Sequence, residues 1–529
     1  MLREAAYYSR MAAGIFRYVR APRTPDPIAK IRAQVENRAA AFLQTVEKAV
    51  FSDPSHPYTE MFRLAGCTHG DLTTAVRRNG LEATLEQLHA DGVCLDHDEF
   101  KGVKPIVRSG RHIATSPHSF RNPLVRGLLE SSSGASRSLG TQTPRSVADL
   151  LVREDQEMLR RTEFALHARS LIEVRPVLPS TTGLNPSMRM SRFGQPVERW
   201  FVPGGTWRSA AHYRVATYGL VAWANISGAS VPVPQQLPPN DFSPVVDYVQ
   251  ARIASGRACA VGTNVSAAVR IIRTAVERGF DISGTLFLLH GEPLSDSKAA
   301  FIAESGCHAI SHYAISEIGI IGSGCREMVN RNCAHLFSDS VAAIVVPRPS
   351  PFFGSQVNSL LFTTLYATAP HLFINADMHD CGVIEQARCD CTYSNIGFTL
   401  QVHDIYSYGK LTGFGMTLAA GDVLRLIEDI LPRRFGGLPG DCQLAESEDL
   451  SGTRMSLRIS PRLKIESPEA AKQVFLNELK HIYGGSLAAR TWEHAAAVEV
   501  VSAEPYATRG GKILPLYLIR EKAQNAHAS

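Results

Sequence analysis

Short apolar runs that alternate with helical segments constrain the fold of this chain more than any other feature. Gly, Ser and Pro separate four such runs, and we expect each to be a strand: residues 170–177, 220–224, 258–262 and 285–289. The periodicity of the segments around them predicts helices over residues 146–166, 266–279 and 295–305. Strands that alternate with helices favour an α/β fold, layered around a largely parallel sheet.

Other patterns flank this body. Residues 28–50 and 71–90 have helical periodicity, with Asp71 as the expected N-cap, and residues 340–347 and 359–367 are expected to form a smaller β-rich unit. A helix over residues 422–431 should end at Pro432, and an α+β unit should follow from Phe435. These patterns predict a large N-terminal body that is helical up to about residue 118, and a compact C-terminal α+β domain.

Composition narrows the possible partners and the compartment. The 55 basic and 50 acidic residues give a net charge of only +5 without a Lys/Arg run, which gives no support to nucleic-acid binding. The sequence contains no run of about 18 apolar residues, so it predicts no helix that spans a membrane. The 10 cysteines are too sparse for a secreted disulfide scaffold, so we expect a reducing, cytoplasmic location with a local metal site.

Two segments have the chemistry of a phosphate and nucleotide site. Residues 130–143 (ESSSGASRSLGTQT) form a Ser/Gly-rich loop that can present N–H and hydroxyl donors to phosphate, although such loops are often plain linkers. In residues 289–324, one strand ends at Gly291-Glu292-Pro293, and a second ends near Tyr313, Ser316 and Glu317. At the carboxyl edge of a sheet, the Tyr can stack on a purine and the Glu can hold Mg²⁺. An exposed strand end is the alternative.

Two single residues complete the candidate set. Asp380 lies in residues 371–382 and can accept hydrogen bonds from ribose hydroxyls, or it is an exposed loop residue. Lys512 follows Gly510-Gly511 on a glycine-rich loop, where it can reach an anionic site as a point charge.

These four segments, in this order, resemble the adenylate-forming acyl/aryl-CoA ligase superfamily, and most of all its phenylacetate–CoA ligase-like branch. The resemblance covers about Tyr58 to Leu516. It implies an N-terminal adenylation domain over residues 1–407 and a small mobile C-terminal lid domain over residues 408–529. It implies that the phosphate loop of type SSGTTGKP corresponds to Ser132, Ser133, Gly134 and Ser136. It further implies an adenine-side segment at Gly291, Glu292 and Pro293, and contacts with adenine, phosphate and Mg²⁺ from Tyr313, Ser316 and Glu317. Asp380 matches the ribose-binding Asp, Gly415 the hinge-side Gly, and Lys512 the catalytic Lys.

The sequence departs from this pattern at several positions. The phosphate loop lacks its second Gly and its Lys-Pro, with Arg137 in the place of the Lys, and Ala314 replaces the Gly after Tyr313. The segment before Asp380 lacks its Arg and Gly, and the hinge segment is Tyr408-Gly-Lys410. These changes bear on the identity of the acyl acceptor more than on adenylation.

The resemblance implies ATP-dependent activation of a small-molecule carboxylic acid to acyl-AMP, with release of pyrophosphate, and then acyl transfer to a thiol such as coenzyme A. One alternative is an amide- or ester-forming ligase, or a carrier-protein loader, that uses the same acyl-AMP with an amine, an alcohol or a carrier protein. A second alternative is a catalytically degenerate binding or scaffold protein. Members of this branch often form homodimers, and the sequence leaves the oligomeric state open.

A separate group of residues has the spacing of metal ligands. Cys325 and His335 form C-x9-H, and Cys389 and Cys391 form C-x-C. Three thiolates and an imidazole satisfy tetrahedral Zn²⁺ with no open position, so the role would be structural. A similar pattern occurs in part of the phenylacetate–CoA ligase-like branch. Cys333 and Cys381 compete as ligands, and unrelated free cysteines are the alternative.

Overall fold

The structure is a computed structural model of the whole chain. It describes residues 2–116, 118–125, 129–132, 142–203, 211–238, 240–349, 356–407, 410–413, 416–449, 452–482, 489, 498–508 and 510–519.

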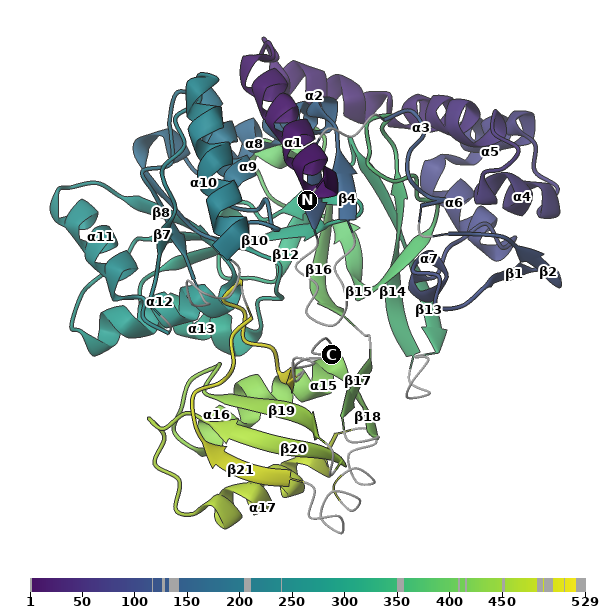
Figure 1. Ribbon diagram of the computed structural model, residues 1–529. Helices are drawn as coiled ribbons and strands as arrows, with labels where there is room; N and C mark the ends of the chain where they lie inside the picture. Colours follow the sequence, from purple (N-terminus) through teal and green to yellow (C-terminus); the bar gives the residue numbers. More distant parts are fainter. Residues whose placement is uncertain are drawn as a thin grey trace, which may run out of the picture.

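A mixed sheet forms the centre of the main body (Figure 1). Among the described residues it has twelve strands, in the spatial order β13 (Val341–Pro349), β14 (Gln356–Thr364), β15 (Ala376–Gln386), β16 (Leu400–Ser407), β12 (Cys333–Leu336), β11 (Gly319–Ser323), β10 (His308–Ile315), β9 (Leu286–His290), β8 (Cys259–Thr263), β5 (Ser170–Val174), β6 (Arg199–Val202) and β7 (Gln235–Gln236). From β10 to β7 neighbouring strands are parallel, and from β13 to β10 they are antiparallel. The expected α/β fold is confirmed, and the β-rich unit is the antiparallel half of this sheet.

Helices cover both faces of the parallel half. On one face α11 (Ser243–Ala254), α12 (Val265–Glu277) and α13 (Asp296–Glu304) enclose a core that includes Val246, Ile272 and Phe287. On the other face α8 (Val147–Glu163) and α9 (Leu184–Arg192) lie over a cluster that includes Leu288 and Ile310. The ends of the parallel strands lie between these two layers of helices, so side chains at the strand ends can reach a ligand.

The N-terminal region is helical, as expected, but its elements differ in detail. It contains α1 (Leu2–Arg20), α2 (Pro27–Glu36), α3 (Arg38–Val46), η1 (Glu47–Phe51), α4 (Pro57–Leu64), α5 (His69–Asn79), α6 (Leu81–Ala90), α7 (His97–Phe100) and the strands β1 (Ile106–Arg108) and β2 (Arg111–Ile113). The helix expected over residues 71–90 is two helices that meet at Gly80, whose φ is +85°. Thr68, not Asp71, is the N-cap, and Asp71 is its reciprocal partner in a capping box.

One expected strand is wrong. Residues 220–224 lie inside α10 (Ala211–Ile226), which packs against α1. Leu220, Val221 and Ala224 are buried, whereas Trp223 is exposed, and this spacing is helical. A short apolar run is compatible with either element, and here its position within a longer helix decides the outcome.

The C-terminal unit has its own core. Its four strands have the order β21 (Val498–Ser502), β20 (Gly452–Ile459), β19 (Cys442–Asp449) and β22 (Leu516–Ile519), with α17 (Pro468–Leu479) packed on them. The hairpin β17 (Lys410–Gly413) and β18 (Met416–Ala419), and then α15 (Ala420–Arg425), η4 (Leu426–Ile430) and α16 (Leu431–Arg434), precede this sheet. Pro432 does not end the helical segment, because it lies in the first turn of α16, where proline is tolerated. The boundary expected at residue 408 lies outside the described residues and stays a prediction.

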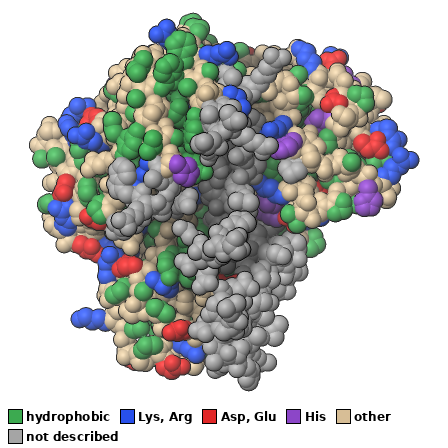
Figure 2. Space-filling view, in the orientation of Figure 1, with side chains coloured by type: hydrophobic (Ala, Val, Ile, Leu, Met, Phe, Trp, Pro, Cys, Tyr) green, Lys and Arg blue, Asp and Glu red, His purple; other side chains and the backbone are tan. Residues whose placement is uncertain are grey.

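Charges of both signs are interspersed on the face shown in Figure 2, whereas hydrophobic side chains gather over α1 and α10. Phe16 of α1 and Trp223 of α10 have 38% and 39% of their surface exposed, and their ring centroids lie 6.4 Å apart. None of the helices in the described part of the chain is both long and apolar enough to cross a membrane.

Candidate active site and metal centre

The sequence-predicted residues meet at the carboxyl ends of the parallel strands, where α/β sheets bind ligands. Gly291 directly follows β9, Tyr313 lies near the end of β10, and Glu317 lies in the connection from β10 to β11. Asp380 is added by β15 of the antiparallel half, and Lys512 by the C-terminal unit. Five residues from four segments of the sequence thus converge on one edge of the sheet.

Tyr313 and Asp380 are in direct contact. The Tyr313 hydroxyl donates a hydrogen bond of 2.7 Å to Asp380 Oδ2. Burial raises the pKa of Asp380 to about 6 and the pKa of Tyr313 well above its ordinary value. Asp380 lies within β15 rather than in a loop, beside an irregularity in the pairing of β15 with β16. This pair offers a ring face and a carboxylate next to each other, which suits a nucleoside.

Glu317 is buried and has a cationic partner that sequence reasoning missed. Lys101, which follows α7, donates from Nζ to Glu317 Oε1 over 2.8 Å. The main chain beside it is also held, because Arg145 donates to the Ser316 carbonyl over 2.7 Å. The carboxylate therefore lies in a fixed position with a positive charge against it. Lys101 belongs to the N-terminal helical region, and no local motif points to it.

Lys512 reaches the sheet edge from the C-terminal unit. Its Nζ donates to the Gly291 carbonyl over 2.6 Å. Thr508 fixes the loop around it, because its Oγ1 accepts from the Lys512 N–H and its N–H donates to the Lys512 carbonyl. Burial lowers the pKa of Lys512, and the negative charge of Glu292 opposes this shift. The cation is thus held at Gly291, directly after β9.

The Lys512 loop lies on the start of α12. Asn264, the N-cap of α12, donates from Nδ2 to the Gly510 carbonyl over 2.7 Å, and Ser266 Oγ accepts from the Ile513 N–H. The Ser266 N–H and hydroxyl donate to the two carboxylate oxygens of Glu292, each over 2.8 Å. The Glu292 side chain is therefore tied to α12, and Pro293 continues the chain toward α13. An Asn between a strand and a helix predicts an N-cap. It does not predict the hydrogen bond from Asn264 to the Gly510 carbonyl.

Part of the predicted site lies outside the described residues: Ser133, Gly134, Ser136, Arg137, Tyr408 and Gly415. Ser132 ends β3 (Leu129–Ser132), which pairs with β4 (Gln142–Arg145) so that Ser132 is opposite Gln142. The predicted phosphate loop thus connects two antiparallel strands.

The four predicted metal ligands come together beside β11 and β12. Cys389 Sγ lies 3.9 Å from Cys325 Sγ, 3.7 Å from Cys391 Sγ and 3.1 Å from His335 Nε2. A tetrahedral zinc with Zn–S bonds of about 2.3 Å separates its sulfur atoms by about 3.8 Å. The competing cysteines bond elsewhere, because Cys333 contacts Gln401 and Cys381 donates to the Tyr406 carbonyl. The geometry selects Cys325, His335, Cys389 and Cys391 as one set.

Neighbouring groups orient these ligands. His335 Nδ1 lies 2.8 Å from the Phe398 carbonyl, which fixes the proton on Nδ1 and leaves Nε2 toward the sulfur atoms. The hydrogen bond from Cys325, aided by His335, lowers the pKa of the Cys391 thiol. A thiolate and a neutral imidazole are the states that a metal ligand needs.

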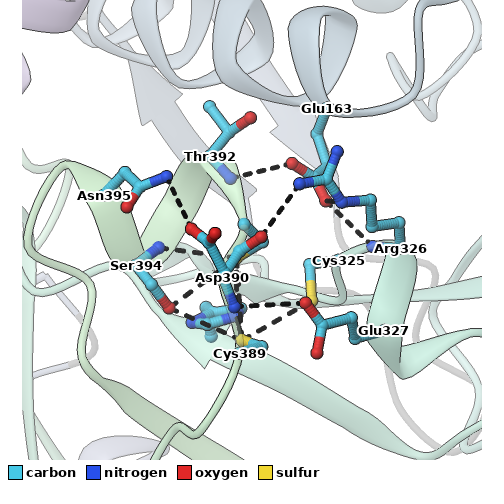
Figure 3. A network of polar contacts seen from close by, with 11 residues as sticks. Glu163, Cys325, Arg326, Glu327, Cys389, Asp390, Thr392, Ser394 and Asn395 are labelled. Atoms are coloured by element: carbon cyan, nitrogen blue, oxygen red, sulfur yellow. Dashed lines mark hydrogen bonds and ion pairs between the residues drawn. The ribbon is translucent and has the colours of Figure 1, made fainter.

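Glu163, at the end of α8, joins the two cysteine loops (Figure 3). Its carboxylate accepts from the Arg326 N–H over 3.0 Å and from the Thr392 N–H over 2.9 Å. Arg326 and Glu327 in turn bond the main chain of Asp390, which lies between Cys389 and Cys391. The polar network therefore holds the cysteines in place from outside the set.

No protein-family model matches the chain, and no curated protein matches it. Solved structures do. One is a 2-hydroxyisobutyryl-CoA ligase in the postadenylation state with 2-HIB-AMP, at 16% identity and a TM-score of 0.50, covering 95% of this chain and 92% of that one. The same ligase with R3-HIB-AMP matches at 16% identity, with 95% and 92% covered and a TM-score of 0.49. O-succinylbenzoate coenzyme A synthetase from Bacillus subtilis, in complex with AMP, matches at 9% identity, with 74% and 68% covered and a TM-score of 0.40.

At these identities the likeness concerns the fold. The match to the first structure extends over nearly the full length of both chains, so it includes the main body and the C-terminal unit. The chain therefore shares its α/β fold with this 2-hydroxyisobutyryl-CoA ligase.

Proposed function

We propose that this protein activates a carboxylic acid with ATP to an acyl-AMP, releases pyrophosphate, and then passes the acyl group to a thiol such as coenzyme A. The observation that carries the proposal is the position of Lys512. This lysine of the C-terminal unit bonds to Gly291, which directly follows β9, and β9 pairs with the strand of the main body that carries Tyr313. The Lys512 ammonium then lies between the proposed site for the nucleoside and the proposed site for the carboxylic acid.

In the proposed first half-reaction a carboxylate oxygen attacks the α-phosphorus of ATP, and the bond to the leaving pyrophosphate breaks. Lys512 stabilises the negative charge that develops on the phosphoryl oxygens, and the loop after Ser132 holds the outer phosphates. Tyr313 stacks on the adenine, Asp380 accepts from the ribose hydroxyls, and the main chain of Gly291-Glu292-Pro293 borders the base. Ser316 contacts phosphate. Mg²⁺, when bound with ATP, neutralises phosphate charge. Glu317 is the proposed ligand, and the ammonium of Lys101 against it supports a cation position there.

The first test is carboxylate-dependent ATP–pyrophosphate exchange across aryl, fatty and amino acids. Lys512→Ala should lower the exchange rate by about 100-fold or more, because one donor to the developing charge is worth that much. Lys464→Ala, an exposed lysine of the same unit, is the matched control and should exchange normally. Undiminished exchange in Lys512→Ala contradicts the role of Lys512, and no exchange with any acid favours a degenerate binding or scaffold protein.

The acyl acceptor is proposed to be coenzyme A, with an amine or a carrier protein as alternatives that use the same acyl-AMP. Coverage of both domains of a CoA ligase fold supports this choice. Supplying coenzyme A, an amine or a carrier protein to the preformed acyl-AMP separates the three, because only one should accelerate loss of the acyl-AMP.

We further propose that the Cys325, His335, Cys389 and Cys391 set holds one structural Zn²⁺, and that the chain belongs with the phenylacetate–CoA ligase-like branch. The sulfur separations and the fixed His335 tautomer support zinc. None of the 10 cysteines, all of which lie in the described part of the chain, is in a disulfide, which supports a reducing, cytoplasmic location. A homodimer is proposed from the branch alone, and analytical ultracentrifugation tests it.

A further inference from the structure

Two histidines lie side by side at the carboxyl edge of the sheet, and the proposed reaction does not use them. His290 ends β9, and the register of the parallel pair places His312 of β10 opposite it. His290 Nε2 and His312 Nδ1 are both buried, and neither has a hydrogen-bond partner among the described residues. Buried polar atoms in native proteins are nearly always paired, so two neighbouring exceptions point to a bound group that pairs them.

The imidazoles lie on the face of the sheet that α8 and α9 cover. Leu288 and Ile310, two residues earlier on the same strands, belong to the cluster under these helices. Since side chains alternate along a strand, His290 and His312 point to the same side. Tyr313, the next residue of β10, points to the other side, toward Phe362 and Asp380.

The position of Lys512 indicates where the reacting group lies relative to the two histidines. Its amino group bonds to the carbonyl of Gly291, the residue directly after His290. The nucleoside belongs to the side of Tyr313 and Asp380, so the histidine side receives the acyl part of the substrate. This assignment rests on the proposed function.

The charges around the two rings are mainly positive. Glu157 is shared by Arg160 and Arg189, and Glu173 pairs with Arg175. Burial holds the pKa of both histidines well below the ordinary range, and cations add to this effect: Arg175, Lys512 and Arg160 for His290, and Arg160, Arg175, Arg189 and Arg153 for His312. Neutral imidazoles in a positive field can donate N–H groups to an oxygen acceptor.

We propose that the acid that this protein activates carries a second oxygen acceptor near its reacting carboxylate, a hydroxyl, carbonyl or second carboxylate group, which His290 and His312 bind. An unsubstituted alkanoic or aryl acid leaves both ring nitrogens unpaired. A site built to bond a substrate oxygen discriminates strongly against the analogue that lacks it.

The test uses pairs of acids that differ only in the second oxygen group: butanoate against its 2-hydroxy, 3-hydroxy, 2-oxo and terminal carboxylate derivatives, and benzoate against 2-hydroxybenzoate. In ATP–pyrophosphate exchange the best oxygen-bearing member should exceed its plain partner in kcat/KM by about tenfold or more. His290→Leu and His312→Leu should remove most of this preference by lowering kcat/KM for the oxygen-bearing acid alone. His308→Leu, at the exposed start of β10, is the matched control and should keep the preference.

A binding readout guards against variants that fold poorly. Acyl-sulfamoyl adenosine analogues of the same acid pairs are titrated calorimetrically into wild-type protein and into His290→Asn and His312→Asn, which keep a polar side chain. Tighter binding of the oxygen-bearing analogue to wild type, with the difference reduced in both Asn variants, supports the inference. Equal binding of the two analogues, or equal exchange with plain acids, overturns it while the proposed function stands. If no analogue binds and no acid exchanges, the proposed function fails and this inference fails with it.

Discussion

Asp380 is the group at the site whose protonation should be visible in stability. Its ordinary pKa of 3.8 is raised to about 6 by burial in the folded protein. Folding therefore favours the protonated carboxyl. The stabilising contribution is complete below about pH 4 and is lost as the pH rises through about 6.

The side chain in Asp380→Asn is neutral at every pH, so this variant should not lose stability in this way as the pH rises. From pH 4 to pH 8 its free energy of unfolding should rise by about 2–3 kcal/mol relative to wild type, since one pKa unit is worth about 1.4 kcal/mol. Urea denaturation at several pH values measures this. Tyr313→Phe removes the donor that favours the ionised form, so the midpoint should move to higher pH. Parallel pH profiles for wild type and Asp380→Asn would contradict the burial effect.

Lys101 should compete with a divalent cation for Glu317. Lys101→Met removes the ammonium 2.8 Å from the carboxylate, so Mg²⁺ should bind there without displacing a charge. The Mg²⁺ concentration for half-maximal exchange should fall by about fivefold or more, given an interaction of about 1 kcal/mol or more. Lys104→Met, whose lysine pairs with Asp96 instead, serves as the control. An unchanged or increased Mg²⁺ requirement in Lys101→Met counts against Glu317 as the ligand.

At the scale of secondary-structure elements, the two loops that carry the metal ligands stabilise each other, because neither loop contains a long helix or strand. Purified protein should contain about one zinc per chain. Cys389→Ser should lose the metal and lower the free energy of unfolding by at least about 2 kcal/mol, because metal binding energy is also folding energy. Elemental analysis and thermal unfolding check both effects. Cys381→Ser, outside the set, should retain the metal, and zinc-free wild-type protein from a chelator-free preparation would remove the site.

How far the elements could be predicted depends on how local their signals are. The strand ends at Gly291 and Tyr313 and the helices after Ser146 and Ser295 have clear turn and cap residues, so their places follow from the sequence. Asp380 could be matched by resemblance, but its position inside β15 depends on pairing with β14 and β16. Lys101, Asn264 and the two histidines act through contacts between distant segments, and a single sequence contains no record of such contacts.

For the whole molecule, the relation between the C-terminal unit and the main body should govern the first half-reaction. Arg273 of α12 donates to Asp441 of the C-terminal unit over 2.6 Å, with both side chains buried. Lys298 and Glu428 form a second buried pair over 2.6 Å. These pairs hold the arrangement in which Lys512 reaches Gly291.

Asp441→Asn should weaken this arrangement and lower the exchange rate by about tenfold or more, since breaking a buried ion pair is costly. Transfer of the acyl group from supplied acyl-AMP should change less, because we propose that the C-terminal unit rotates before this second half-reaction, which already breaks the contact. Glu478→Gln, which affects an exposed pair with Arg434 inside the C-terminal unit, is the control. Equal losses in both half-reactions would contradict a role in one arrangement only.

Helix α8 has a consequence beyond its place in the core. Its last residue, Glu163, holds the two loops of the metal centre, and one turn earlier Arg160 lies among the charges that surround His290 and His312. The helix therefore holds Arg160 in position, and the cysteine loops fix the C-terminal end of the helix. Protein stripped of its metal should first become less selective among acids, while its affinity for nucleotide changes little.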